Sequence, residues 1–251
     1  VSIVPFLLPA FHKPFLSRVS WTGILFLIPM TMGVVFTRSR GGILGLAAVA
    51  WYYFYRRVGL FFSLIALGLL ATVLVAIPRM ESISTQESSA RSRMEHWSHG
   101  LSLLRQKPIF GVGKDMFAEH YPQTAHNSFI LVLSELGIIG GIVWVGMFFA
   151  AFREINFLRG DPRAPPFLQS WLDGLTGAII GWLTCAFFLS HPYKFLSFVL
   201  LALVVGTLNA LQSEGITERH PWTMRQTLWT LGMTIGGVIL VHVMLRVLWS
   251  M

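Results

Sequence analysis

With 251 residues, 54% of them hydrophobic, only 12% charged and a mean hydropathy of +0.65, the chain carries more apolar side chains than one soluble core could bury. The composition therefore excludes an ordinary soluble domain and predicts an all-α, polytopic membrane protein. Lys and Arg outnumber Asp and Glu by 19 to 11, an excess that we attribute to membrane topology and not to nucleic-acid binding. The lone Cys185 excludes an intramolecular disulfide and a cysteine metal cluster.

The first residues, 1–11, are apolar and lack the basic region that opens a signal peptide. The sequence starts without Met, inside what resembles the end of a hydrophobic segment, so we expect residues upstream to be missing. Apolar runs of about 20 residues then predict about seven spanning helices. Their expected bounds are 20–37, 41–55, 58–78, 127–152, 171–190, 195–211 and 226–249.

Basic residues are distributed unequally between the two sides that these helices would connect. One set of connections holds Lys13, Arg18, Arg56, Arg57, Arg153, Arg159, Arg163, Arg219 and Arg225. The opposite short connections hold Arg38, Arg40 and Lys194, with Arg246 near the end of the last helix. The positive-inside rule assigns the richer set to the cytoplasm and the long 79–126 loop to the periplasm of a bacterial inner membrane. We treat residues 1–251 as one membrane domain.

The 79–126 loop is too long for a simple connection, so we expect it to be folded and functional. An amphipathic helix is predicted from Ser88 or Ser89 to Gln106, where Pro108 stops it. Its apolar stripe consists of Met94, Trp97, Leu101 and Leu104.

Charge gathers at three places near the expected outer face. Arg38 and Arg40 lie between two apolar runs and are followed by Gly41 and Gly42. Arginine suits a phosphate because its planar fork donates two parallel hydrogen bonds, and glycine allows a phosphate to approach the backbone. A simple interfacial anchor is the alternative.

The second place is the start of the loop helix, with Arg91, Arg93 and Trp97. Arg93 and Trp97 are four residues apart and share a helix face, so a cation–π pair is possible. A solvated amphipathic helix would have the same pattern.

The third place is His126, Asn127 and Ser128, directly before a spanning helix. Asn127 or Ser128 is expected to cap that helix, which puts His126 beside backbone amides that favour anions. A neutral imidazole there can accept a proton near neutral pH, although an interfacial histidine that is only hydrogen-bonded fits too. Glu135 is expected to brace the bundle, and Gly137, Gly140 and Gly141 to allow close helix packing.

Together these motifs resemble the O-antigen ligase and O-antigen polymerase superfamily of membrane glycosyltransferases. The resemblance is carried, in order, by Ser39-Arg40-Gly41-Gly42, Arg93 with Trp97, Lys107-Pro108-Ile109-Phe110-Gly111-Val112-Gly113 with Phe117, and His126-Asn127-Ser128 through Glu135-Leu136-Gly137 to Gly140. Members usually have more spans before the Ser-Arg-Gly element than this chain has.

The resemblance implies transfer of a glycan from undecaprenyl diphosphate to an acceptor hydroxyl, such as that of a lipid A–core sugar, with inversion and with neither metal nor cofactor. It implies that Arg40 and Arg93 hold the diphosphate and that His126 assists the acceptor. We add Arg91, Arg38 and Asn127 as candidate substrate-binding residues. A polymerase or a protein-glycosylating enzyme would share these motifs.

Two other classes of function remain as alternatives. A transporter would use Arg, His and Glu135 along a path through the membrane, but no inverted repeat is visible. A metal hydrolase would draw its ligands from Glu95, His96, His99, His120 and His126. It lacks an HExxH pattern.

Overall fold

The computed structural model describes residues 5, 18–37, 39–76, 83–163, 165–218 and 220–249. These residues form helices and no strands, which confirms the all-α prediction. The helices are α2 (Arg18–Phe36), α3 (Arg40–Ala76), α4 (Ile83–Gln106), α5 (Phe117–His120), α6 (Ser128–Gly160), α7 (Pro166–Phe188), α8 (Phe195–Ser213) and α9 (Met224–Trp249). Arg38 lies outside the described residues.

Four described helices are long and apolar enough to cross a membrane. They comprise Ser128–Gly160, Phe167–Phe188, Phe195–Ser213 and Met224–Val247. The other three expected spans coincide with α2 and with the two parts of α3, which is interrupted at Gly59, where φ is 81° and ψ is 170°. That these three also cross the membrane stays a prediction.

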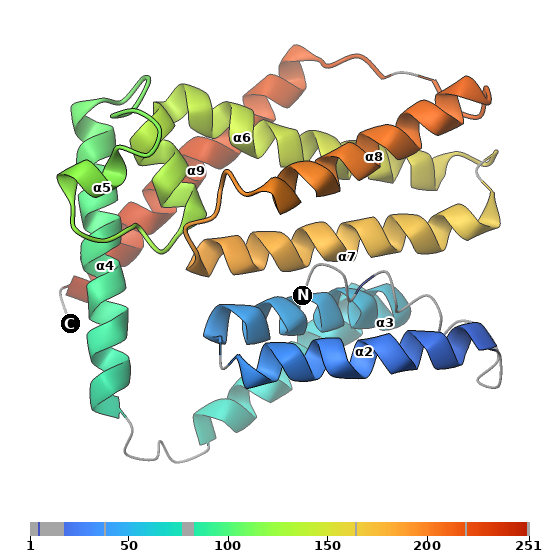
Figure 1. The fold of residues 1–251 in the computed structure, drawn as a ribbon, viewed down its shortest axis with the longest axis horizontal. Helices are drawn as coiled ribbons and strands as arrows, with labels where there is room; N and C mark the ends of the chain where they lie inside the picture. Colours follow the sequence, from blue (N-terminus) through green and yellow to red (C-terminus); the bar gives the residue numbers. More distant parts are fainter. Residues whose placement is uncertain are drawn as a thin grey trace.

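The long helices connect at two opposite ends of the bundle (Figure 1). The ends of α2, α7 and the start of α6 lie together at the end that α4 crosses, whereas the α6–α7 and α8–α9 connections lie at the other (Figure 1). This is the alternation that the sequence predicts. Which end faces the periplasm stays a prediction.

Helix α4 lies almost perpendicular to the bundle, with the short α5 beside it (Figure 1). Its predicted apolar stripe is confirmed, because Trp97, Leu101 and Leu104 are buried and Met94 packs against them. The stripe meets α6 at Ile130 and α9 at the buried Leu245. The loop helix is therefore fixed on the bundle and not free in solvent.

Helix α6 is broken at Gly137, where φ is 66° and ψ is −166°. The span expected over 127–152 lies within this helix, which continues to Gly160, but the sequence did not predict the break. The segment 108–113 pairs with the break: Val112 N and Gly113 N donate to the carbonyls of Ser134 and Glu135, and Ile138 N donates to Pro108, at 2.8–2.9 Å. Backbone groups that the break frees are thus satisfied inside the protein, as a membrane setting requires.

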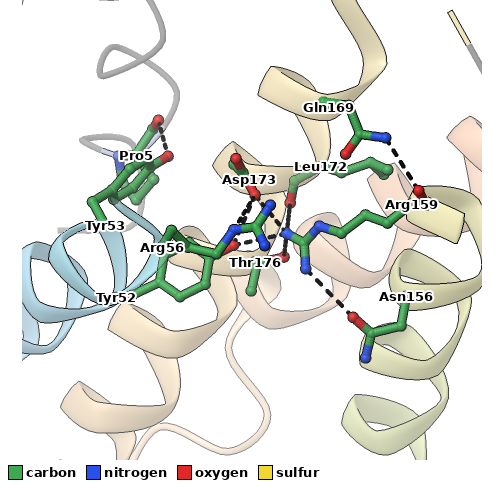
Figure 2. Close-up of polar contacts among 10 residues, drawn as sticks. All are labelled: Pro5, Tyr52, Tyr53, Arg56, Asn156, Arg159, Gln169, Leu172, Asp173 and Thr176. Atoms are coloured by element: carbon green, nitrogen blue, oxygen red, sulfur yellow. Dashed lines mark hydrogen bonds and ion pairs between the residues drawn. The ribbon is translucent and has the colours of Figure 1, made fainter. Parts of the chain in front are cut away.

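At the opposite end of the bundle, a polar network joins α3, α6 and α7 (Figure 2). One guanidinium nitrogen of Arg159 contacts Asp173 Oδ1 at 2.8 Å, the Tyr52 hydroxyl at 2.7 Å and the Thr176 hydroxyl at 2.8 Å. Tyr52 also donates to Asp173, and Arg56 approaches the same carboxylate at 3.4 Å. Partly buried charges are paired here, so the network holds the three helices in register.

Candidate functional site

The three charged segments of the sequence meet around the end of α7. Gly41 packs closely against Phe188: a Cβ added to Gly41 would lie only 3.0 Å from the Cβ of Phe188. Cys185 Sγ donates to the Gly41 carbonyl at 3.4 Å. The backbone that carries Arg40 therefore packs against the last turn of α7. A Cβ on Gly41 would contact Phe188 so tightly that one of the two would have to shift by a few tenths of an ångström.

Arg93 reaches the same place from α4. Its guanidinium lies over the Phe188 ring, 5.9 Å from the ring centroid. The spacing of Arg93 and Trp97 allowed a cation–π pair, but Trp97 is buried and meets Phe187 edge to face at 5.5 Å. The helix face shared by Arg93 and Trp97 is thus directed at the end of α7, and it contacts two consecutive phenylalanines there.

Arg91 has a different environment although it lies on the same helix. Its side chain is 81% exposed and approaches Glu95 one turn away at 3.8 Å. A pair this exposed contributes little to stability. Of the two arginines, Arg93 is the one that faces the other site segments.

His126 lies between α4 and the start of α6, with its ring 5.4 Å from that of His96. Burial, and then the positive charge of Arg93, lower the pKa of His126, so its neutral form is favoured. Its φ of 48° is uncommon for a residue with a side chain. Such strained backbone clusters at functional sites.

His96 contacts two rings, those of His126 and Tyr121. His96 is only 3% exposed, meets Tyr121 edge to face at 5.2 Å, and lies 3.4 Å from the Ser92 hydroxyl. Tyr121 in turn contacts His99 at 4.6 Å between ring centroids. Burial lowers the pKa of both His96 and His99. Within the described ranges, no group of three or more His, Cys, Asp or Glu residues is arranged to hold a metal ion.

Asn127, one of the two caps that the sequence allowed, is the N-cap of α6. Its side-chain oxygen accepts from Phe129 N at 2.9 Å and Ile130 N at 3.2 Å, and it is fully buried. Its Nδ2 has no hydrogen-bond partner among the described residues. Capping accounts for the oxygen, and only the amide nitrogen is left for a substrate.

Glu135 connects α6 to the segments that carry Phe117 and Tyr193. Its carboxylate accepts from the Tyr193 hydroxyl at 2.9 Å and from Phe117 N at 3.3 Å. The Glu135 side chain is buried, and its two hydrogen bonds fix the segments of Phe117 and Tyr193 to α6. This agrees with the structural role expected for Glu135.

An apolar cavity of about 340 Å³ lies beside Asn127 between α6, α9 and the end of α7. Phe129, Trp144 and Phe187 line one part of it, and Leu240 of α9 lines another. Its walls have the apolar character that a lipid chain requires.

Sequence reasoning did not identify the segment from Phe187 to Tyr193 as part of the site. Phe188 lies against both Gly41 and Arg93, and the Leu189 carbonyl accepts from the Ser128 hydroxyl at 2.6 Å. Aromatic residues at the outer end of a span are common anchors at the membrane surface, so they gave no signal of their own. The position of Phe187 to Tyr193 at the candidate site follows only from the packing of α7 against three segments that are distant in the sequence.

Residues 25–145 match the model of the O-antigen ligase family. The matched stretch contains Arg40, Arg93 and His126, together with the glycines at which the 108–113 segment meets α6. A comparison with curated proteins found no match.

Proposed function

We propose, from the premise that this chain belongs to the O-antigen ligase superfamily, that it transfers a glycan from undecaprenyl diphosphate to an acceptor hydroxyl at the periplasmic face of the inner membrane. Family membership gives the coarser role, a multi-pass membrane enzyme of polysaccharide assembly. The donor, the acceptor and the site residues are the proposal.

One observation carries the proposal: the segments that bear Arg40, Arg93 and His126 converge on Phe188 and Leu189, although they are far apart in the sequence. Arg93 is also near enough to His126 to lower its pKa. This supports a site in which Arg93 binds the diphosphate and a neutral His126 accepts the acceptor's proton, because transfer from a diphosphate requires a cation and a base close together.

The reaction is a single displacement with inversion. The acceptor oxygen attacks the anomeric carbon of the donor sugar as the bond from that carbon to the diphosphate oxygen breaks. The hydroxyl proton passes to His126, and undecaprenyl diphosphate leaves with the bonding electrons. Arg40 and Arg93 offset the charge that develops on the leaving group by forked hydrogen bonds.

The lipid part of the donor needs an apolar surface next to this site. The cavity beside Asn127 provides one, and the buried Nδ2 of Asn127, which has no hydrogen-bond partner among the described residues, is the donor we assign to the diphosphate there. Arg91, whose side chain faces solvent, is left out of the diphosphate site. Arg38 remains a proposed ligand on sequence grounds alone.

The test is transfer by the purified full chain in lipid nanodiscs with a defined undecaprenyl-diphosphate glycan. Lipid A–core and a second molecule of the donor serve as alternative acceptors, and the product distinguishes a ligase from a polymerase. We expect glycan transfer to lipid A–core that is unchanged in EDTA. No transfer to any hydroxyl acceptor would contradict the proposal, and loss in EDTA that zinc or magnesium restores would contradict the metal-independent mechanism.

A further inference from the structure

A second cavity, of about 280 Å³, lies on the other side of the first turn of α6 from the apolar one. Three segments form it: the residues around Lys114, the buried face of α6 at Glu135, and the α7–α8 connection from Ser190 to Lys194. Its volume is close to the lower end of small-molecule sites, about 300 Å³. The sequence assigned no function to this cavity.

Its walls mix charged, hydroxyl and aromatic groups. Lys114 Nζ lies 5.5 Å from the centroid of the Tyr193 ring, while Tyr193 donates its hydroxyl to the Glu135 carboxylate. A carboxylate accepts about four hydrogen bonds, and Tyr193, Phe117 N and the Asp115 backbone use part of that capacity on Glu135. Lys114 Nζ donates to Asp115 Oδ2 at 2.6 Å, which leaves two of its three donors for a ligand. The Ser190 hydroxyl, which also lines the cavity, is buried without a hydrogen-bond partner in the described part of the chain.

These groups match a saccharide better than they match a lipid chain. A sugar presents many hydroxyls, each of which donates and accepts, and this cavity offers a carboxylate acceptor, ammonium donors and an unpaired serine. The apolar cavity beside Asn127 has the opposite character. One cavity is thus polar, as a site for a glycan acceptor must be, and the other is apolar, as a site for the donor's lipid must be.

The polar cavity is joined to His126 through the start of α6. The Ser128 hydroxyl, two residues after His126, donates to the Leu189 carbonyl and accepts from His191 N at 3.0 Å. Thr124, two residues before His126, lines the cavity as well. The cavity is therefore connected to the backbone on both sides of His126, through Thr124 and through Ser128.

We propose that this cavity binds the acceptor saccharide and directs one of its hydroxyl groups toward His126, an inference that rests on the glycosyl transfer proposed above. Glu135 and Lys114 bind sugar hydroxyls directly. Tyr193 fixes the Glu135 carboxylate and supplies the ring beside the sugar.

The experiment uses the full chain in nanodiscs and measures two quantities on each variant. The first is equilibrium binding, without donor, of the core oligosaccharide released from lipopolysaccharide. The second is the KM for acceptor and for donor in the transfer assay. The variants are Lys114→Ala and Glu135→Gln, and Lys107→Ala is the control because it removes an exposed lysine outside the cavity.

We expect each cavity variant to bind the oligosaccharide about tenfold more weakly and to raise the KM for acceptor by the same factor, since each loses a hydrogen bond to a charged group. The KM for donor should stay unchanged, and Lys107→Ala should match the parent. Lys114 is 58% exposed, so its variant will fold even where Glu135→Gln does not.

Oligosaccharide affinity that is equal in parent, Lys114→Ala and Glu135→Gln overturns the inference, as does a parent that binds no oligosaccharide. An equal rise in the KM for both substrates overturns it too, because that pattern indicates a general distortion. A parent that binds the oligosaccharide through this cavity but transfers no glycan would instead contradict the proposed function and leave the binding site standing.

Discussion

At the scale of single residues, Arg91 and Arg93 are only two positions apart but have different surroundings. Arg93 lies over Phe188 and lowers the pKa of His126, whereas Arg91 extends into solvent beside Glu95. We predict that Arg93→Lys lowers the transfer rate by about 10²-fold, because a lysine has no planar fork for the diphosphate. Arg91→Lys is the matched control and should retain the parent's rate. Rates are compared at equal amounts of inserted protein, and equal loss in both variants would contradict the assignment.

The protonation of His126 gives a second prediction at this scale. Burial and Arg93 lower the pKa of His126, so the neutral, proton-accepting form persists at lower pH than for an ordinary histidine. Single-turnover transfer at saturating donor should therefore lose activity in acid only below pH of about 6.5. Arg93→Gln removes a positive neighbour, so the pKa of His126 should rise and the acid loss should move to higher pH.

The pH profile of Arg93→Gln separates this role from donor binding. If the rate falls but activity is lost in acid at the same pH as in the parent, the charge of Arg93 does not act on His126. His99→Gln is the control, because His99 contacts Tyr121 and Phe117 but shares no ring contact with His126 in the described structure.

At the scale of elements, apolar runs predicted most helices to within a few residues, including the amphipathic α4. They could not predict the break in α6, because Gly137 in an apolar run looks the same whether it permits helix packing or ends a helix. The deciding partner, the segment 108–113, is distant in sequence. Gly111 likewise packs its backbone against that of Gly137, although the two glycines are far apart in the sequence.

Gly137→Ala should therefore destabilise the protein. Its φ and ψ lie in a region open almost only to glycine, which costs about 1–3 kcal/mol for another residue, and the added methyl would overlap the Ile109 carbonyl. Gly232→Ala in α9 is the control, because nothing lies within 4 Å of its added Cβ. Thermal unfolding in detergent should show a clear loss for Gly137→Ala and no loss for Gly232→Ala. Equal melting temperatures would contradict the backbone contact.

At the scale of the whole molecule, the sequence predicted the alternation of helix ends because spacing and charge are local properties. That Arg40, Arg93 and His126 act at one site stays a prediction from resemblance to a family, since these residues belong to different helices or loops. The sequence missed Phe188 and Tyr193, whose roles depend on where the end of α7 meets other segments. Packing between distant segments has no periodic signature in a sequence.

The network at the far end of the bundle yields a prediction for the whole fold (Figure 2). Asp173→Asn leaves the partly buried Arg159 without its carboxylate, which costs up to about 3–5 kcal/mol. Asp161→Asn is the control, since its partner Arg163 is half-exposed and solvent screens a pair of this kind. Melting temperatures compare the two variants, and a drop no larger for Asp173→Asn than for Asp161→Asn would show that the network does not hold the helices.

The central claim is that His126 accepts the proton of the acceptor while arginines hold the donor. It is tested most directly by measuring donor affinity and single-turnover transfer on the same purified His126→Ala protein. A positioned base contributes about 10²–10⁴-fold, so transfer should fall by roughly that factor while donor affinity stays near the parent's. Transfer as fast as the parent's, or a loss explained entirely by failure to bind donor, would contradict the claim and reduce His126 to a structural residue or a donor ligand.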